Sequence, residues 1–370
     1  MRTGMPDLDD VEELVARDVD GLLQSVARAG AQVRAVAEAV REGVLSPLSE
    51  LRPRSVVIVS GSHRAAAAAA DLAVAVLAAY TDVPLVCVPA LPGWVGPLDV
   101  VVILGDDAGD MMLADAAARA ARRRAEVVVG APLEGPLRDA LGGTGIDLSP
   151  RIQVDRRFGF GGFVAVVVAV VTGLSSVRFT GVAPGLDGIA DALDAEAAAN
   201  HVSRESFHNQ AKLLASRMVD ASVVVCGDTP AAVVTAGQAA AAVLAVAGVV
   251  CAATDVAGAA TLVRDRAGSD AGAPADSLFH DPFIDGPAPA AVTVLVLGVP
   301  RREWQVRRWA GALGEAMIVI GSVGGEADQP IMPGSATDSG GDRPADLEAL
   351  LLTLLRVDMA AVYLRLIRGS

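Results

Sequence analysis

The chain has 370 residues, which is enough for two domains, because single hydrophobic cores usually stop growing at about 250–300 residues. Its formal net charge is −14, and its cations are nearly all arginine, since Lys212 is the only lysine. An acidic chain without a basic stripe is a poor candidate for nucleic-acid binding, so we expect no such partner. Hydrophobic residues make up 52% and aromatic residues 3%, which predicts the Ala-, Val- and Leu-rich cores of parallel α/β layers.

The three cysteines, Cys87, Cys226 and Cys251, lie in apolar runs without metal-binding or redox spacing. We interpret them as small buried side chains of a protein from a reducing compartment. The first residues quickly turn acidic and contain no apolar stretch, so we expect no signal peptide and a cytoplasmic location.

One uncharged segment, Thr229–Thr254, is long enough to span a bilayer. It is rich in alanine, carries Gln238 and has no cationic flank. Gly248 separates a helix-like part from the strand-like Val249–Cys251. These features favour a buried helix followed by a buried strand, and we expect no membrane partner.

Apolar residues recur at helical spacing over residues 8–42, and short Val-rich runs then alternate with helices. This alternation is typical of βαβ units and predicts a parallel sheet. The predicted strands of the first lobe are Ser55–Ser60, Pro84–Val88, Asp99–Leu104, Val127–Gly130 and Ile152–Val154. Its predicted helices are His63–Tyr80, a helix ending at Arg124, and Phe163–Leu174, with a Gly-rich loop before residue 152.

The polar region Thr180–Asn200 is predicted to connect two lobes. The second lobe repeats the pattern, with predicted strands Ser222–Cys226, 249–252, Val292–Leu297 and Met317–Ile320. Its predicted helices are Ala197–Met218, one starting at Pro230, 302–315 and Leu347–Ile367. Residues 265–277 and 329–346 are predicted to be surface loops. We therefore predict N-terminal helices in residues 1–45, a first domain in 46–178 and a second in 195–370.

The loop after the first predicted strand carries Ser60, Ser62 and Arg64 at the start of a helix. Backbone N–H groups, hydroxyls and a guanidinium in this position can hold an anion such as phosphate. Ser62 can equally serve as a helix cap.

The corresponding loop after the third predicted strand is acidic and carries Asp106, Asp107 and Asp110. Carboxylates at a helix start stabilise the helix dipole and would repel a phosphate. Helix capping and a divalent-cation site are both compatible with this pattern.

The glycine-rich turn Phe158–Phe163 matches a dinucleotide-binding fingerprint poorly, because its third spacing fails. A nucleotide-dependent enzyme stays a minor alternative. Arg156 and Arg157 precede this turn, and a sugar phosphate needs a nearby cation. Two ordinary surface arginines would give the same pattern.

The histidines differ in context. His201 and His208 are predicted to lie on one solvated helix face with Glu205. His280 lies in Leu278–Gly286, an aromatic cluster that predicts an ordered, buried turn. A histidine there could transfer protons at neutral pH, although simple packing explains the cluster equally well.

In their order along the chain, these segments resemble the bacterial and archaeal bifunctional phosphoglucose/phosphomannose isomerases, two-lobed proteins of the SIS (sugar isomerase) fold. Val56–Ser62 is similar to the family's first phosphate loop. Arg157 before Gly161–Phe163 is similar to its Arg–Gly–aromatic segment. Asn209–Ala215 is similar to its Asn-x-Ala-Lys-x-x-Ala helix, with Lys212 in register.

Two further segments carry the resemblance. Leu278–Asp281 is similar to the family's Leu-Asn-His-Asn turn, whose histidine opens the sugar ring, and Val362–Gly369 is similar to its C-terminal helix. The resemblance implies an α/β fold of two SIS-like lobes, each a parallel sheet flanked by helices. It implies His280 as catalytic residue, a sugar phosphate as ligand and no metal or other cofactor, and it leaves a homodimer open. The substrate-binding residues that it implies are Ser60, Ser62, Arg64, Arg157, Gln238 and Lys212.

Two departures from the family pattern bear on function. The second phosphate loop has lost its hydroxyls, and Ala239–Ala242 stand where the family's catalytic glutamate is expected. One interpretation is an aldose–ketose isomerase of glucose or mannose 6-phosphate with a relocated base, Asp281 or Asp285, beside His280. The other is a catalytically inactive relative with a regulatory or protein-partner role in sugar-nucleotide metabolism.

Overall fold

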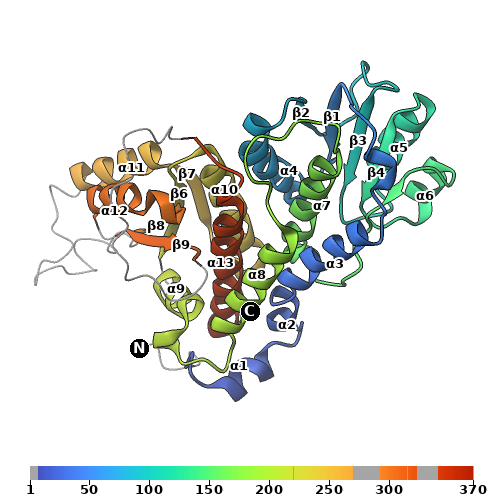
Figure 1. Cartoon of the computed structure of the whole chain (residues 1–370). Helices are drawn as coiled ribbons and strands as arrows, with labels where there is room; N and C mark the ends of the chain where they lie inside the picture. Colours follow the sequence, from blue (N-terminus) through green and yellow to red (C-terminus); the bar gives the residue numbers. More distant parts are fainter. Residues whose placement is uncertain (1–6, 220, 270–291, 315, 323–340, 370) are drawn as a thin grey trace, which may run out of the picture.

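The computed structural model describes residues 7–219, 221–269, 292–314, 316–322 and 341–369. Within these residues the backbone forms two parallel sheets flanked by helices, which confirms the predicted α/β class and its two lobes (Figure 1). The first sheet has the order β2-β1-β3-β4-β5 and the second the order β7-β6-β8-β9. The strands are β1 Ser55–Val59, β2 Leu85–Val88, β3 Asp99–Leu104, β4 Glu126–Gly130, β5 Ile146–Asp147, β6 Ser222–Gly227, β7 Cys251–Asp255, β8 Val292–Gly298 and β9 Met317–Ile320.

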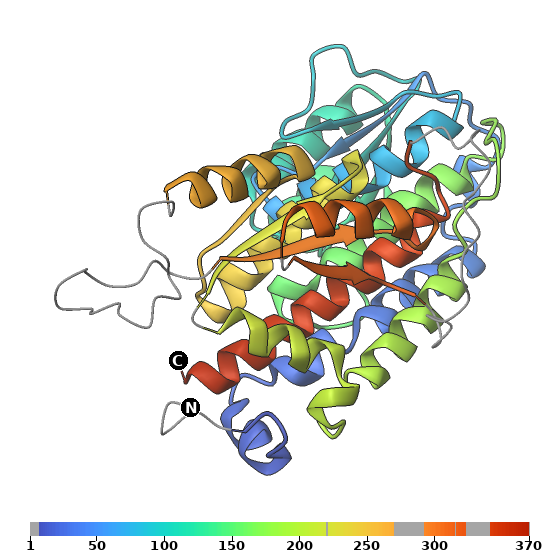
Figure 2. The same cartoon turned by 90° about the vertical axis from the view of Figure 1, so that its left-hand side faces the viewer.

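Helices precede, connect and cover these strands (Figures 1 and 2). The α-helices are α1 Val11–Arg17, α2 Leu22–Val26, α3 Ala29–Arg41, α4 Arg64–Leu77, α5 Met111–Arg122, α6 Gly135–Leu141, α7 Phe160–Gly173, α8 Leu186–Ala199, α9 Gln210–Met218, α10 Pro230–Ala247, α11 Val256–Ser269, α12 Glu303–Ala312 and α13 Asp346–Arg368. Short 3₁₀ segments are η1 Ser46–Leu48, η2 Ala78–Tyr80, η3 Arg156–Phe158, η4 Ser206–His208 and η6 Pro300–Arg302.

The strand order places a topological switch point in the first sheet. β1 pairs in parallel with β2 on one side and with β3 on the other, with Val57 opposite Val101 in the latter pair. The chain therefore leaves β1 toward one edge and β3 toward the other, so the loops after their carboxyl ends diverge and leave a crevice. Ligands of open α/β sheets bind in such a crevice.

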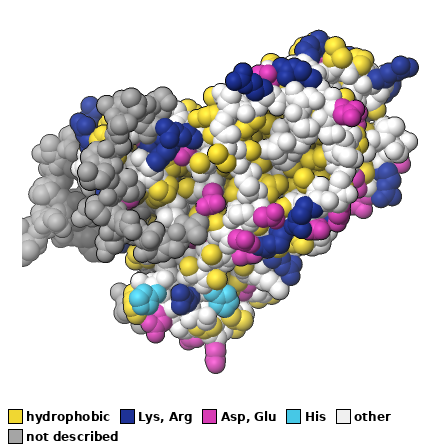
Figure 3. All heavy atoms as spheres, in the orientation of Figure 1, with side chains coloured by type: hydrophobic (Ala, Val, Ile, Leu, Met, Phe, Trp, Pro, Cys, Tyr) yellow, Lys and Arg dark blue, Asp and Glu magenta, His cyan; other side chains and the backbone are white. Residues whose placement is uncertain are grey.

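A layer of apolar helices between the two sheets holds the lobes together. One continuous hydrophobic cluster includes strand residues of both lobes, such as Val56 and Val223, together with α4, α7, α10 and α13. α13 is buried along nearly its whole length and runs through the molecule in Figure 2. Figure 3 shows hydrophobic side chains gathered along the middle of the face where the lobes meet.

α10 is the predicted uncharged helix. Its 18 residues are long and apolar enough to cross a membrane by length and composition alone, but 56% of them are buried inside the fold. It packs against β6, β7, α13 and α4, and Gly248 in the left-handed region ends it before β7. It therefore forms part of the core between the lobes, as a core helix of this composition is expected to do.

The three cysteines form no disulfide. Burial raises the pKa of Cys87, Cys226 and Cys251 to about 12, so each thiol stays protonated near neutral pH. Cys226 is buried as expected, whereas Cys87 and Cys251 are half-buried.

The predicted strand Ile152–Val154 is wrong, and the edge strand of the first sheet is β5. The backbone of this segment pairs with the N-terminal helical region rather than with the sheet. Arg28 donates a hydrogen bond to the carbonyl of Gln153 (3.0 Å), and the N–H of Asp155 donates to the hydroxyl of Ser25 (2.6 Å). The predicted Gly-rich loop before it contains helix α6.

Helix limits also differ from expectation around residue 200. The predicted connection contains α8, and the predicted helix Ala197–Met218 is interrupted between α8 and α9. The side chain of Asn200 accepts from the N–H of Ala211 (2.9 Å), and Asn209 caps α9 by accepting from the N–H of Lys212 (2.9 Å). His201 therefore lies in the loop and not on a shared helix face with a second histidine. The domain limits at residues 45, 178 and 195 stay predictions.

The carboxyl group of Asp358 is buried with one oxygen that has no hydrogen-bond partner. Asp358 lies on α13 with 7% exposure, its Oδ1 has no hydrogen-bond partner, and it borders a small apolar cavity that also touches Phe160 and Leu354. Burial raises the pKa of Asp358 well above its usual value. The native protein therefore holds this carboxyl protonated to higher pH than the unfolded chain, which ionises it once the pH exceeds that usual value.

This difference in the pKa of Asp358 between the native and unfolded states makes the free energy of unfolding depend on pH. As pH rises above the usual pKa of an aspartate, unfolding releases a proton from Asp358, so its contribution to the free energy of unfolding falls by about 1.4 kcal/mol per pH unit until its native pKa is reached. We expect Asp358→Leu to be more stable than the wild type, with a margin that widens as pH rises above the usual pKa of an aspartate. Urea unfolding at several pH values measures this margin.

Asp99 is the control, because it is also buried but its pKa is lowered: burial opposes ionisation, and hydrogen bonds from Arg54, Gly96 and Ser55 outweigh it. Its ionised form is favoured in the native state, so the stabilisation is lost only as pH falls through its native pKa. The effect of Asp99→Asn should be constant over pH 5.5–7.5. A constant margin for Asp358→Leu would contradict the prediction.

Candidate functional site

A cleft of about 390 Å³ lies between the lobes at the switch point of the first sheet. Its first-lobe wall consists of the start of α4, the loop after β3 and the start of α7, and its second-lobe wall is α10. The polar residues that line it are Ser62, His63, Arg64, Asp106, Arg156, Arg157 and Gln238. Four of the predicted substrate-binding residues, namely Ser62, Arg64, Arg157 and Gln238, are thus brought together although they come from distant parts of the chain.

The turn after β1 is shaped by Gly61. Its φ of +56° lies in the left-handed region, and a Cβ there would stand 2.9 Å from Oδ2 of Asp110. A side chain at this position would therefore be both strained and crowded. The glycine lets the loops after β1 and β3 touch, and this contact brings His63 against the acidic loop.

His63 is held between two carboxylates. Its Nδ1 lies 2.6 Å from Oδ1 of Asp106, and its Nε2 lies 3.0 Å from Oδ2 of Asp110. Each ring nitrogen of His63 therefore contacts a carboxylate from the loop after β3. The His63 clamp, as we call His63 with Asp106 and Asp110, fastens the two loops at the switch point.

The three aspartates of the acidic loop make different contacts. Asp110 is the N-cap of α5 and accepts from the N–H of Met112 (2.7 Å), while Asp107 closes a turn by accepting from the N–H of Gly109 (2.7 Å). Asp106 faces His63 and the cleft. The capping interpretation is confirmed for Asp110. Among the described residues, no group of three His, Cys, Asp or Glu side chains is arranged to hold a metal ion.

Three guanidinium groups border the cleft. Arg64 donates to the carbonyl of Gly237 (3.2 Å) and so connects the lobes. Arg157 is paired with Asp155 through two hydrogen bonds of 2.7 and 2.8 Å, and these bonds lower the pKa of that carboxyl. Arg156 has a side chain that is 85% exposed, and its Nε is 3.8 Å from Asp106. Arg156 therefore pairs less closely with a protein carboxylate than Arg157, the arginine that was predicted to bind substrate.

Gln238 carries the clearest sign of a missing partner. Its side chain is 5% exposed on the α10 wall, and its Oε1 has no hydrogen-bond partner. A buried acceptor without a donor costs about 1–3 kcal/mol. A ligand hydroxyl or amine in the cleft would remove this cost.

The rest of the α10 wall is apolar. Ala241, Ala242 and Ala245 complete it next to Gln238. The described part of this wall therefore offers a hydrogen-bonding amide but no group that could take up a proton from a sugar carbon.

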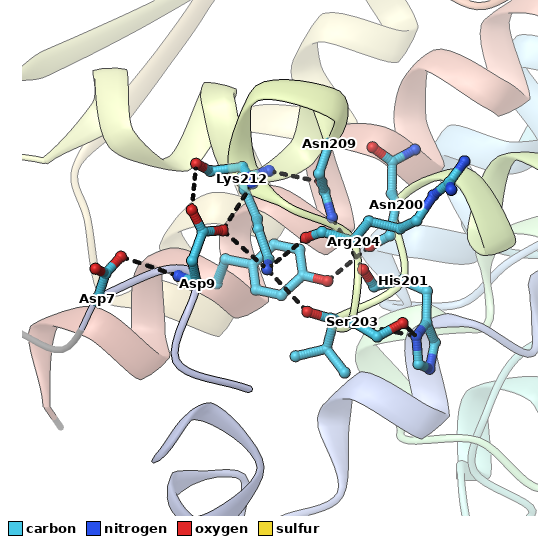
Figure 4. A network of polar contacts seen from close by, with 11 residues as sticks. Asp7, Asp9, Asn200, His201, Ser203, Arg204, Asn209 and Lys212 are labelled. Atoms are coloured by element: carbon cyan, nitrogen blue, oxygen red, sulfur yellow. Dashed lines mark hydrogen bonds and ion pairs between the residues drawn. The ribbon is translucent and has the colours of Figure 1, made fainter. Parts of the chain in front are cut away.

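Two predicted substrate-binding residues lie elsewhere. Ser60 is buried at the end of β1 and is not part of the cleft wall. Lys212 is fully buried on α9, where its Nζ donates to the carbonyls of Val202 (2.8 Å) and Arg204 (2.7 Å) and stands 3.7 Å from Asp9 (Figure 4). Burial lowers the pKa of Lys212, and Asp9 counteracts it.

The donors of Lys212 are engaged by backbone carbonyls and Asp9, which favours a structural role, and its assignment to substrate binding stays a prediction. The predicted catalytic His280, with Asp281 and Asp285, lies outside the described residues. His63 and Arg156 join the site without having been predicted as substrate-binding residues. The signal for His63 was available, since loops after neighbouring parallel strands must meet at one edge of the sheet.

No protein-family model matches the chain, and no curated protein matches it. Solved structures do match over nearly the whole length. Tagatose-6-phosphate ketose/aldose isomerase from Escherichia coli has 13% identity and a TM-score of 0.58, covering 100% of this chain and 97% of that chain. The C-terminal domain of glucosamine-fructose-6-phosphate aminotransferase from Francisella tularensis has 9% identity and a TM-score of 0.54, covering 96% of both chains.

A glucose-6-phosphate isomerase-like protein from Thermus thermophilus has 15% identity and a TM-score of 0.52, covering 99% of this chain and 95% of that chain. At these identities the likeness shows the fold alone. This chain has the two-lobed fold of such phosphosugar proteins, which confirms the expected SIS-type architecture. A closer relation to the bifunctional phosphoglucose/phosphomannose isomerases stays a prediction.

The structural role of Lys212 can be tested by Lys212→Met, which keeps the stem and removes the three donors. We expect a loss of about 2–4 kcal/mol in the free energy of unfolding, because the buried carbonyl of Val202 and the partly buried carbonyl of Arg204 lose a charged donor. Arg217→Met, at an exposed position of the same helix, should change it by less than about 0.5 kcal/mol. Urea denaturation measures both. Equal stability of the two variants would contradict the structural role.

Proposed function

We propose that this protein binds a sugar phosphate in the cleft between its lobes. The observation that carries the proposal is the position of Gln238, whose buried Oε1 has no hydrogen-bond partner, on the wall of a cleft bordered by three guanidinium groups. A sugar phosphate combines hydroxyl donors for the amide oxygen with an anion for the arginines. A purely apolar or cationic ligand would leave one of these two features unmatched.

The phosphate is best accommodated on the side of Arg64 and Arg156, within reach of the exposed Ser62 at the start of α4. The switch point itself is occupied by the carboxylates of the His63 clamp, which would repel a phosphate. Charge-assisted hydrogen bonds from guanidinium groups to phosphate are among the stronger polar contacts in proteins. The sugar then points toward Gln238 on the opposite wall.

We infer that the protein acts by binding rather than by isomerising its ligand. Aldose–ketose isomerisation needs a base that moves a proton between neighbouring carbons, and such help is typically worth about 10²–10⁴-fold in rate. The described α10 wall carries alanines at this place. A binding role fits a cytoplasmic protein that regulates or assembles steps of sugar-nucleotide metabolism, with homodimer formation left open.

A second candidate, isomerisation of glucose or mannose 6-phosphate, is favoured by the presence of His63 on the cleft wall. Histidine is well suited to proton transfer near neutral pH. Both ring nitrogens of His63 face carboxylates, however, so the ring must leave one of them before it can reach a substrate. The predicted catalytic His280 belongs to this second candidate.

Isothermal titration with fructose 6-phosphate and glucose 6-phosphate tests the binding proposal. We expect saturable binding to the full chain, at least tenfold weaker in Arg156→Ala and in Gln238→Ala, since a lost hydrogen bond to a charged or buried group costs about 1.5–3 kcal/mol. Arg119→Ala, at an arginine of α5 that pairs with Asp115 outside the cleft, is the control and should bind like the wild type.

Absence of binding to the wild-type chain at millimolar ligand would reject the proposed function. A coupled assay for conversion of fructose 6-phosphate to glucose 6-phosphate separates the two candidates. We expect no turnover above background, and turnover that His63→Ala abolishes would establish the isomerase candidate instead.

A further inference from the structure

A second cavity of about 170 Å³ lies next to the inter-lobe cleft, between α3, residues 148–154 and the start of α7. We call it the α3–α7 pocket. Its walls are mainly apolar and include Ala35, Val36, Leu148, Ile152 and Val166. The proposed sugar-phosphate site makes no use of it.

The α3–α7 pocket and the cleft share part of their walls. Asp106, Arg156 and Phe163 line both cavities, so the two spaces adjoin along these side chains. One ligand of sufficient length can therefore occupy the pocket with one end and the cleft with the other. The shared charged residues, Asp106 and Arg156, then face the middle of such a ligand.

The size of the pocket suits one planar ring system. An engineered apolar cavity of about 150 Å³ in another protein binds benzene. The α3–α7 pocket is slightly larger, and Phe163 supplies an aromatic ring on its wall. Stacking of a nucleobase on an aromatic side chain is worth about 1–3 kcal/mol.

The glycine-rich turn explains the room available in the pocket. Gly159 and Gly162 line it, and a Cβ on Gly162 would stand 3.2 Å from Oε1 of Gln32. The turn fails as a dinucleotide fingerprint because its spacing is wrong for wrapping a diphosphate. Its glycines instead leave space beside α3.

The shared wall has the chemistry for the middle of a nucleotide. The exposed guanidinium of Arg156, at 3.8 Å from Asp106, is placed to pair with phosphates between the two cavities. Oδ1 of Asp106 is bound to His63, whereas its Oδ2 has only this long contact to Arg156. That oxygen can accept from a ribose hydroxyl.

We infer that the natural ligand class is a nucleoside diphosphate sugar, with the base in the α3–α7 pocket, the diphosphate at Arg156 and the sugar at Gln238. This inference rests on the proposed function, because it extends the same sugar site by a neighbouring subsite. A nucleoside diphosphate sugar has a planar base for the apolar α3–α7 pocket, a diphosphate for Arg156 and sugar hydroxyls for Gln238.

Isothermal titration with UDP-glucose, GDP-mannose, UDP and glucose 1-phosphate tests the inference on the full chain. We expect at least one of the two sugar nucleotides to bind at least tenfold more tightly than glucose 1-phosphate. Ala35→Leu fills the pocket without touching the cleft, and because Ala35 is only half-buried the variant should fold. It should reduce sugar-nucleotide affinity to the level of glucose 1-phosphate and leave glucose 1-phosphate binding unchanged.

Ala31→Leu, the same substitution one turn earlier on α3 and outside both cavities, is the matched control and should keep wild-type affinities. Sugar nucleotides that bind no more tightly than glucose 1-phosphate would overturn the inference and leave the proposed function standing. Tight binding of UDP without any binding of glucose 1-phosphate would reject the sugar-phosphate site and support the base pocket. If Ala35→Leu lowered the affinity for sugar nucleotides and for glucose 1-phosphate equally, the division into two subsites would be overturned.

Discussion

The contact between α4 and α10 is the constraint on which the rest of this structure depends. Both helices turn alanines toward the shared core, among them Ala69 and Ala73 of α4 and Ala236 of α10. Small side chains let two helices approach closely, so the two sheets can share one hydrophobic layer. The same approach brings the start of α4 beside Gly237, where Arg64 reaches across, and thereby creates a cleft whose walls come from different lobes.

The charge distribution in this cleft follows from local requirements of the helices. Asp110 is needed to cap α5, and its neighbour Asp106 would add repulsion if His63 did not lie between them. The two carboxylates are thus bridged by a side chain from the neighbouring loop. The positive charge of the cleft comes from Arg156 and Arg64. An anion is therefore bound more favourably near these arginines, toward the opposite lobe, than at the switch point.

Much of the fold could be predicted, because strands buried on both faces, such as β1 and β3, read as nearly uninterrupted apolar runs. Ile152–Val154 has the same appearance but pairs its backbone with helices, which no local pattern reveals. The residues of the site were harder to predict, because their positions also depend on contacts between distant parts of the chain. Ser62 and Gln238 could be proposed from motifs, whereas the burial of Lys212 by carbonyls ten and eight residues earlier depends on a loop conformation that the motif does not encode.

The apolar character of α10 has a consequence for the way the protein is made. This helix is synthesised well before α13, which covers it in the finished fold, and β8, α12 and β9 come between them. A nascent chain therefore carries a long uncharged helix that can already pack against α4 and β6 but still lacks α13 as a partner. Such transiently exposed segments favour association with chaperones or with other chains. Efficient production of this protein should accordingly depend on protection of α10 until its last helix has emerged from the ribosome.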